Sequence, residues 1–312
     1  MKMLGPISLD QRAVYEDRLA RYPTVLSEQT FTNMFMWSDS HPFQALDADD
    51  SLVLFDERDR GVVLVGSPIG PIPLAEAARE VEGATGKKVA GFERIGEARA
   101  HSVPGQGWQI EEEADLYDYV YRREDLAELA GRRYHSKRNL IAQCLAEYDC
   151  TYEEISPKNL HELRPMMDRW CDWRRCRDDR GLCSEYRAVK TVLEEFDNLS
   201  VTGAAIRIDG RIEAFTVGQR LNENTAVIHV EKAMPQFKGL YQLINHWYCK
   251  NGLSRFEFVN REQDVGIPGL RKAKESYHPD HMVKKFVIFP RGERDALGPR
   301  RRAGERCLDE EG

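Results

Sequence analysis

The Asp209-Gly210 pair constrains the fold more than any other feature of the sequence, because it separates two apolar runs at residues 203–208 and 212–220. The central residues of a two-residue hairpin turn need positive φ, and Asp-Gly is one of the pairs that adopts it most readily. An alternating run follows at residues 225–231. The sequence therefore predicts a β-hairpin and a further strand in the second half of the chain.

Helices and strands also alternate around this hairpin. Helical patterns precede and follow it, at residues 157–173, 185–196, 236–251 and 270–276. Two more strand-like runs close the half, at residues 256–260 and 283–289. This order of elements matches that of the GNAT acyltransferase fold. Such a match supports a fold, whereas function has to be argued from the site.

The length of 312 residues is comfortable for two domains. The first half also mixes helical and strand-like runs, with strands expected at residues 52–55, 61–66 and 117–121. We expect an α/β protein, in the sense of α+β with mixed sheets, built as two tandem GNAT-like acyltransferase domains. The expected divisions are a degenerate N-terminal domain (1–121), a basic helical bridge (122–150), a C-terminal domain with the active site (151–290) and a disordered tail (291–312).

Composition excludes several classes of protein. The net charge of −7 argues against a general nucleic-acid coat protein, so any polyanion site must be local. No run approaches the roughly 18 apolar residues of a membrane helix, and we expect a cytoplasmic protein. The spacing of Cys171, Cys176 and Cys183 is not that of a zinc ribbon or finger. We expect no metal and no tightly bound cofactor.

Five runs resemble a known family: SEQTFTNMFMW, GRRYHSKRN, AVIHVEKA, FKGLYQLIN and the more specific NREQDVGIPGLRKAKESYHP, which starts at Asn260. They are similar to soluble proteins related to the C-terminal domain of phosphatidylglycerol lysyltransferase, over roughly residues 5–290. The resemblance implies a tandem GNAT fold and aminoacyl transfer from aminoacyl-tRNA. It carries the reaction class better than the acceptor, because the membrane-spanning portion of the characterised members is missing from this sequence.

A donor site is expected where the loop at residues 234–241 enters a helix, because backbone N–H groups at a helix start can hold phosphates. Gly239 permits close backbone approach and Lys238 supplies a cation, with Leu240 and Tyr241 completing the loop. The usual acetyltransferase loop carries more than one glycine, which weakens the case for coenzyme A. The alternative is an ordinary glycine at a helix start beside a surface lysine.

The strand at residues 225–231 places His229 and Glu231 on one face. Glu231 is the better candidate for a base or for an anchor of the amine of an aminoacyl donor. His229 is either catalytic or a core histidine with its hydrogen bonds satisfied.

Polar residues also gather after the strand at 256–260. Substrate contacts are expected from this turn and the helix after it, at Asn260, Arg261, Glu262, Asp264 and Lys272, unless they form a solvated turn with local ion pairs. Tyr277 would donate a proton to the leaving group, or is a packed aromatic residue.

The segment at residues 131–139 is basic and contains no acidic residue. Its cations either form a phosphate-binding face or are merely solvated, and the residues concerned are Arg132, Arg133, Lys137 and Arg138.

The function expected from these features is acyl transfer, with an aminoacyl group moving from aminoacyl-tRNA to an amine or hydroxyl of a lipid head group or small molecule. The alternatives are an N-acyltransferase that uses acyl-coenzyme A and a catalytically silent binding protein on the same fold. The expected partners are tRNA and the acceptor, with peripheral membrane contact allowed.

Overall fold

The computed structural model describes residues 2–103 and 107–298, which divide into two compact units. Within these residues, the first unit contains the chain up to Asp118, the short segment Gln263–Ile267 and the chain from Met282 onward. The second unit contains Tyr119–Glu262 and Pro268–His281. The chain therefore passes between the units several times, and each unit is described separately below.

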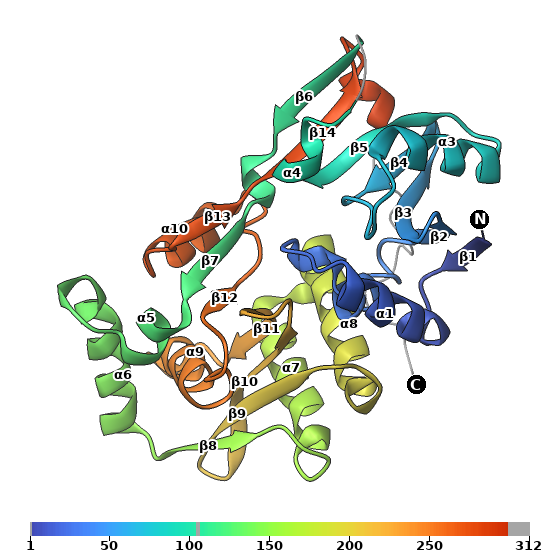
Figure 1. Cartoon of the computed structure of the whole chain (residues 1–312). Helices are drawn as coiled ribbons and strands as arrows, with labels where there is room; N and C mark the ends of the chain where they lie inside the picture. Colours follow the sequence, from blue (N-terminus) through green and yellow to red (C-terminus); the bar gives the residue numbers. More distant parts are fainter. Residues whose placement is uncertain (1, 104–106, 299–312) are drawn as a thin grey trace. The chain divides into compact units, whose positions relative to one another are not determined.

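The first unit is built on a seven-stranded mixed sheet with the order β1-β2-β3-β4-β5-β14-β6 (Figure 1). β4 and β5 are parallel, and the other neighbouring pairs are antiparallel. The strands are β1 (Lys2–Pro6), β2 (Gln44–Ala48), β3 (Ser51–Arg58), β4 (Gly61–Val65), β5 (Val89–Gly96), β6 (Trp108–Glu112) and β14 (Lys285–Pro290). The helices are α1 (Arg12–Arg21), α2 (Phe31–Met36), α3 (Leu74–Thr85) and α4 (Glu97–Ala100).

The main core of this unit lies between the sheet and α3. Leu74, Ala77 and Val81 recur at helical spacing along α3 and are fully buried against the strands. Leu64 of β4 and Ile288 of β14 belong to the same apolar cluster. β14 therefore supplies core residues to this unit, although it comes from the end of the described chain.

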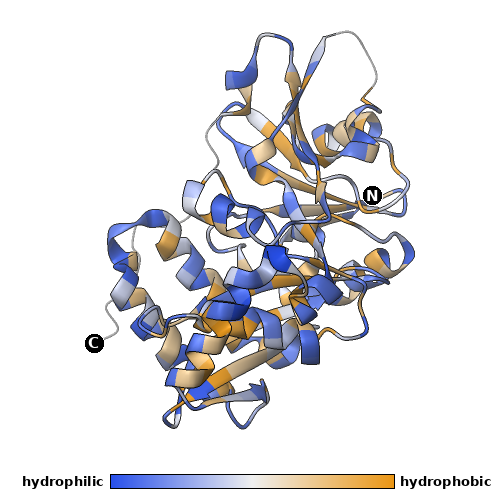
Figure 2. Cartoon of the chain, turned by 90° about the vertical axis from the view of Figure 1, so that its left-hand side faces the viewer, coloured by the Kyte–Doolittle hydropathy of each residue, from blue (hydrophilic) through white to orange (hydrophobic). Residues whose placement is uncertain are grey.

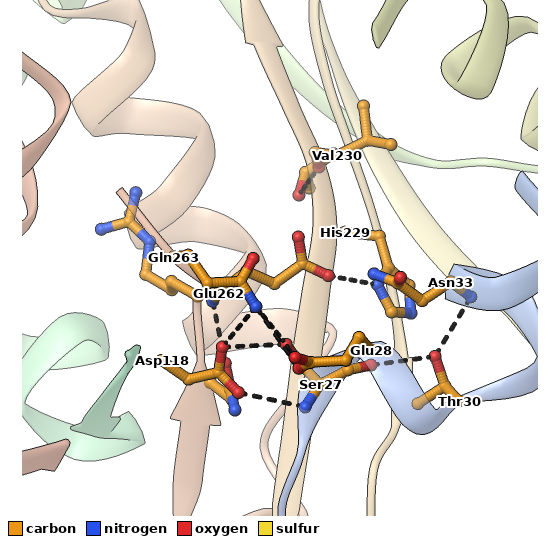
Figure 3. Close-up of polar contacts among 12 residues, drawn as sticks. Ser27, Glu28, Thr30, Asn33, Asp118, His229, Val230, Glu262 and Gln263 are labelled. Carbon is orange, nitrogen blue, oxygen red and sulfur yellow. Dashed lines mark hydrogen bonds and ion pairs between the residues drawn. The ribbon is translucent and has the colours of Figure 1, made fainter. Parts of the chain in front are cut away.

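A buried charge cluster joins four segments of the first unit (Figure 3). Lys285 is completely buried, and its Nζ donates to Glu28 Oε2 and Asp118 Oδ1, both at 2.6 Å. Gln263 Nε2 donates to Asp118 Oδ1 at 2.7 Å, and Ser27 N donates to Asp118 Oδ2 at 3.0 Å. Because buried charges are tolerated only when paired and hydrogen-bonded, these contacts explain how a lysine occupies the interior.

The second unit holds a seven-stranded mixed sheet with the order β13-β7-β12-β11-β10-β9-β8. β11 and β12 are parallel, so their carboxyl ends meet at one edge. Asp209 and Gly210 have φ values of 49° and 78°, which confirms the predicted hairpin turn between β9 and β10. The strands are β7 (Asp118–Arg122), β8 (Cys150–Glu154), β9 (Thr202–Ile208), β10 (Arg211–Arg220), β11 (Thr225–Ala233), β12 (Phe258–Asn260) and β13 (His281–Val283).

Helices cover both faces of this sheet. Two neighbouring side chains of β11, which point to opposite faces, show this. Glu231 contacts Asn245 of α9 on one face, and Lys232 contacts Glu185 of α8 on the other. The strands between the helices carry the most hydrophobic stretches (Figure 2). The helices are α5 (Arg123–Glu128), α6 (His135–Glu147), α7 (Leu160–Arg174), α8 (Arg180–Glu194), α9 (Leu240–Asn251) and α10 (Pro268–Glu275).

The mixed α/β class is confirmed, and the hairpin lies in one sheet with β11 and β12 as predicted. Two strands differ from expectation, because the run at 117–121 becomes β7 of the second sheet and the run at 283–289 becomes β14 of the first. The helical bridge is interrupted at Leu129 and Gly131, which both have positive φ.

The expected tail is also partly folded. Leu297 is buried and its carbonyl accepts from Arg58 Nη1 at 3.1 Å, while residues 299–312 lie outside the described residues.

Candidate functional site

Glu231 lies at the centre of a polar cluster at the carboxyl ends of β11 and β12. Its Oε1 accepts a hydrogen bond from Arg261 Nη2, and its Oε2 accepts one from Asn245 Nδ2, both at 2.8 Å. The side chains of Glu231 and Arg261 are each only 14% exposed. Because charge-assisted hydrogen bonds strengthen in a poorly solvated environment, this arrangement fixes all three side chains.

Two polar atoms of the cluster are buried without a hydrogen-bond partner among the described residues. They are Arg261 Nη1, a donor, and Asn245 Oδ1, an acceptor. The Asn245 amide is oriented by Glu231, because a carboxylate only accepts and must face the NH2 group. Leaving a buried polar atom unpaired costs about 1–3 kcal/mol, so both atoms need a partner such as an ordered water molecule or a ligand.

Tyr277 closes the cluster on the side of α10. Its ring centroid lies 4.8 Å from Arg261 Cζ and 4.2 Å from Lys137 Nζ. Burial raises the pKa of the Tyr277 phenol well above its ordinary value. A tyrosine with its ordinary pKa of about 10 is already protonated at neutral pH, and the raised pKa makes this phenol a weaker acid.

Lys137 differs from the sequence expectation. Lys137 is only 9% exposed, and its Nζ donates to Ser276 Oγ at 2.6 Å. Burial, and secondarily the positive charge of Arg261, lower the pKa of Lys137. Lys137 thus points toward Tyr277 and does not belong to an exposed basic face, because the hydrophobic contacts of α6 carry it inward.

The other members of the basic segment are mostly engaged locally. Arg133 Nη2 pairs with Asp125 Oδ2 at 2.8 Å, and Arg138 Nη1 donates to the carbonyls of Leu129 and Gly131. Arg132 is exposed and makes no side-chain hydrogen bond or ion pair within the described chain. The arginines at 133 and 138 therefore hold the interrupted turn before α6, and this structural use competes with phosphate binding.

The loop before α9 has the helix-start glycine that the sequence indicated. Gly239 has a φ of 89°, and a Cβ atom added there would overlap the carbonyl oxygen of Leu140 in α6. The glycine is therefore required by the packing of α6 on α9. Lys238 is exposed, Leu240 is buried, and Tyr241 Oη accepts from Trp170 Nε1 at 3.0 Å.

His229 forms a second polar contact in this unit, with its Nδ1 2.7 Å from Glu262 Oε1 (Figure 3). Its side chain is completely buried. Asn260 Oδ1 accepts from Glu262 N at 2.8 Å, and Lys274 Nζ donates to the carbonyls of Arg261 and Glu262. Glu262 itself has a φ of 56°, an unfavourable conformation for a non-glycine residue that these contacts maintain.

Comparison with known proteins identifies the family of this chain. A family model described as phosphatidylglycerol lysyltransferase, C-terminal, matches residues 19–289. The chain belongs to this family. The resemblance found in the sequence motifs is thereby confirmed.

Solved structures share the fold of this lysyltransferase-family chain. A conserved protein of unknown function from Bacteroides thetaiotaomicron is 27% identical, with a TM-score of 0.83 over 91% of this chain and 98% of that chain. L-PGS from Bacillus licheniformis is 15% identical, with a TM-score of 0.64 over 93% and 95% of the two chains.

One relative comes from the curated proteins. An uncharacterized protein of Mycoplasmoides gallisepticum is 23% identical over 176 residues, which is 55% of this chain. The chain spans 55% of the length of that relative. In the parts of the chain that the structure describes, no helix has both the length and the apolar character needed to cross a bilayer.

Of the site residues predicted from the sequence of this lysyltransferase-family chain, the structure brings Glu231, Arg261 and Tyr277 together. Two other predicted residues have different surroundings. Lys272 is exposed on α10 without an ion pair in the described residues, and Asp264 is buried with its Oδ1 accepting from Gly266 N. Asn245 was missed by sequence reasoning. The available signal was an asparagine on the apolar side of α9, where Leu240, Leu243 and Ile244 are also buried.

Proposed function

We propose that this chain is an acyltransferase that moves an aminoacyl group from aminoacyl-tRNA to an amine or hydroxyl acceptor. The observation that carries the proposal is the unpaired donor and acceptor beside Glu231, namely Arg261 Nη1 and Asn245 Oδ1. An aminoacyl ester offers the complementary groups, because its α-ammonium donates and its carbonyl oxygen accepts. Membership of the lysyltransferase family supports the same reaction class.

The ammonium group is the feature that separates the candidate donors. Glu231 and Asn245 present a carboxylate and an unpaired amide oxygen, which suit three N–H donors. An acetyl or fatty acyl group has no ammonium, so Asn245 Oδ1 would stay unpaired at a cost of about 1–3 kcal/mol. The cluster therefore favours an aminoacyl donor over ordinary acyl-coenzyme A.

The transfer step balances without a metal or redox partner in the scheme. The acceptor nitrogen or oxygen attacks the carbonyl carbon, the bond from that carbon to the ribose oxygen breaks, and the acceptor's proton ends on the released hydroxyl. Arg261 Nη1 would stabilise the oxyanion that develops on the carbonyl oxygen. Tyr277 would relay this proton, giving its phenolic proton to the leaving oxygen and taking the acceptor's proton in exchange.

The acceptor in this proposal is a lipid head group or a small molecule with a free hydroxyl or amine. The family description names a lipid-modifying enzyme, and L-PGS shares the fold, which supports a head group as the first candidate. We further propose that the two units are tandem GNAT-like domains, with the first one degenerate. The seven-stranded mixed sheet in each unit supports this duplication.

Parallel assays of donor use would test the proposal. Binding and transfer should be measured with charged tRNA, uncharged tRNA, an aminoacyl-nucleoside ester and acetyl-coenzyme A. We expect transfer from charged tRNA and from the ester, and the loss of most ester transfer in Glu231→Gln and Asn245→Leu. Glu194→Gln, at an exposed ion pair with Arg164, is a matched control outside the cluster. Tight, salt-insensitive binding of acetyl-coenzyme A with transfer to an amine would reverse the choice of donor, and absence of all binding would indicate a silent module.

A further inference from the structure

We propose that the end of α7 and the turn after it form a platform for unpaired nucleotides, in which the Trp173 ring stacks on a base and nearby arginines bind phosphates. This inference rests on the proposed function for the identity of the RNA, since the acceptor end of a tRNA is single-stranded. It assigns RNA recognition to the end of α7 and not to the basic segment at 131–139.

The geometry of the last turn of α7 presents an aromatic ring to solvent. Trp170 is 5% exposed and faces the interior, whereas Trp173 is 56% exposed. Arg174 Cζ lies 5.9 Å from the ring centroids of both tryptophans. Arg175 then adopts a φ of 52° and ends the helix, which turns the chain sharply next to the exposed ring.

Four arginines at the end of α7 and in the chain up to the start of α8 have no carboxylate partner among the described residues. Arg174, Arg175, Arg177 and Arg180 are all exposed, and none makes an ion pair or a side-chain hydrogen bond with another described residue. The only cation–π contacts of Arg174 among the described residues are with the rings of Trp170 and Trp173. Cations that are not neutralised by the protein remain available to phosphates.

Two of the acidic residues in this stretch accept hydrogen bonds from the protein. Asp168 Oδ1 accepts from Tyr186 Oη at 2.5 Å, and Asp179 Oδ1 caps α8 by accepting from Gly181 N and Leu182 N. Asp172 and Asp178 are also exposed, and Asp168 and Asp179 keep their charge when they accept from neutral donors, so four carboxylates accompany the four arginines and the surface is mixed in charge. By contrast, three of the four cations of the segment at 131–139 are used by local contacts.

Contacts of Trp170 tie this platform to the site. Its Nε1 donates to Tyr241 Oη at 3.0 Å, at the start of α9, and Lys232 Nζ lies 4.1 Å from its ring centroid. Lys232 directly follows Glu231 in β11. The last turn of α7 is therefore fixed next to the end of the strand that carries the proposed aminoacyl anchor.

An exposed indole with arginines is the combination that binds single-stranded nucleic acid with little sequence preference. Every base has a face that stacks on an aromatic ring, and arginine adds phosphate contacts. A paired end offers no unstacked base to Trp173. The platform should therefore distinguish an RNA with an unpaired 3′ overhang from a blunt duplex.

The test measures binding of two labelled RNAs, a hairpin with a four-nucleotide 3′ overhang and the same hairpin with a blunt end. Trp173→Ala should weaken overhang binding by about tenfold, because one base-stacking contact is lost, while blunt-end binding stays the same. Trp173→Phe should remain within about threefold of the unchanged protein. The paired change Arg175→Gln and Arg177→Gln should lower the slope of log affinity against log salt by about 0.7 for each lost contact.

Arg211→Gln serves as the matched control, because Arg211 is exposed on β10, outside α7 and the turn that follows it. Equal overhang binding by Trp173→Ala and the unchanged protein would overturn the platform. So would an equal loss of both RNAs. Transfer from the aminoacyl-nucleoside ester separates the two proposals, because it should survive Trp173→Ala. If no transfer is found but overhang binding depends on Trp173, the platform stands and the proposed function fails.

Discussion

Gly239 and the carbonyl oxygen of Leu140 approach so closely that no side chain fits between α9 and α6. Gly239→Ala should therefore destabilise the protein by about 2–4 kcal/mol, through steric overlap and an unfavourable positive φ. The measurement is urea unfolding followed by circular dichroism. Gly83→Ala is the matched control, because Gly83 lies in α3 with open space around it and should gain about 0.5–1 kcal/mol. An unchanged stability of Gly239→Ala would show that the packing of α6 on α9 is not tight.

Arg261→Lys tests the unpaired guanidinium nitrogen. Lysine keeps the positive charge beside Glu231 but has no second planar nitrogen to donate to the carbonyl oxygen. We expect turnover of an aminoacyl ester to fall by about 100-fold, as for loss of one oxyanion donor, with a smaller change in KM. Arg122→Lys, at an exposed ion pair with Asp280, is the control. Full activity of Arg261→Lys would remove Arg261 from the reaction.

Lys137 should make stability depend on pH in the alkaline range. Burial lowers the pKa of Lys137 in the folded state below the ordinary value of about 10.4, so the unfolded state binds more protons between the two values. The contribution of Lys137 to the free energy of unfolding therefore rises as the pH rises through the lowered pKa. The groups that share its surroundings are Arg261, Tyr277 and Ser276.

The difference between Lys137→Met and the unchanged protein isolates this lysine, because other groups titrate equally in both. Lys137→Met should be relatively more stable at pH 7, and its advantage should shrink toward pH 10. Parallel stability curves from pH 7 to pH 10 would contradict the lowered pKa.

Arg207 should stabilise the second unit at neutral pH and less in acid. It donates to Glu153 and Glu162, and these hydrogen bonds lower the pKa of both carboxyl groups. Depressed carboxyl pKa values give stability that is present above the ordinary values near 4.3 and is lost as the pH falls through the folded values. Arg207→Gln should cost about 1 kcal/mol at pH 7 and much less near pH 3.

Arg164→Gln is the comparison for Arg207, since Arg164 and Glu194 form an exposed pair at 47% and 49% exposure and should contribute almost nothing. Thermal melting of both variants at pH 7 and pH 3 gives the result. A cost for Arg207→Gln that does not depend on pH would mean that packing, and not the ion pairs, is responsible.

Local sequence signals predicted the parts of the fold that local chemistry determines. Asp209 and Gly210 have the positive φ values that their turn requires, and the alternating run at 225–231 became β11. These signals could not predict the sheet to which β7 and β14 belong. The hydrophobic pattern of a strand does not reveal which strand far along the chain pairs with it. The assignment of each strand to its own half of the sequence therefore failed.

The residues of the candidate site also divide into those that the sequence could predict and those that it could not. Glu231 and Arg261 were predictable, because both follow from the rule that polar residues at strand ends face the ligand edge. Asn245 was not, because its partner Glu231 lies in another element. The role of Gly239 depends on Leu140, nearly a hundred residues earlier, and the burial of Lys137 depends on the neighbouring Tyr277.

The position of β14 between β5 and β6 has a consequence for synthesis on the ribosome. The first sheet needs a strand that is made after the whole of the second unit, so the N-terminal segment has to wait, incompletely paired, while more than 150 residues emerge. During that interval the edge of β5 that β14 will cover is open, and open strand edges are prone to incorrect pairing. The second unit also needs β7 from the earlier segment. Release of the last strand from the ribosomal tunnel is therefore the event that completes the first sheet.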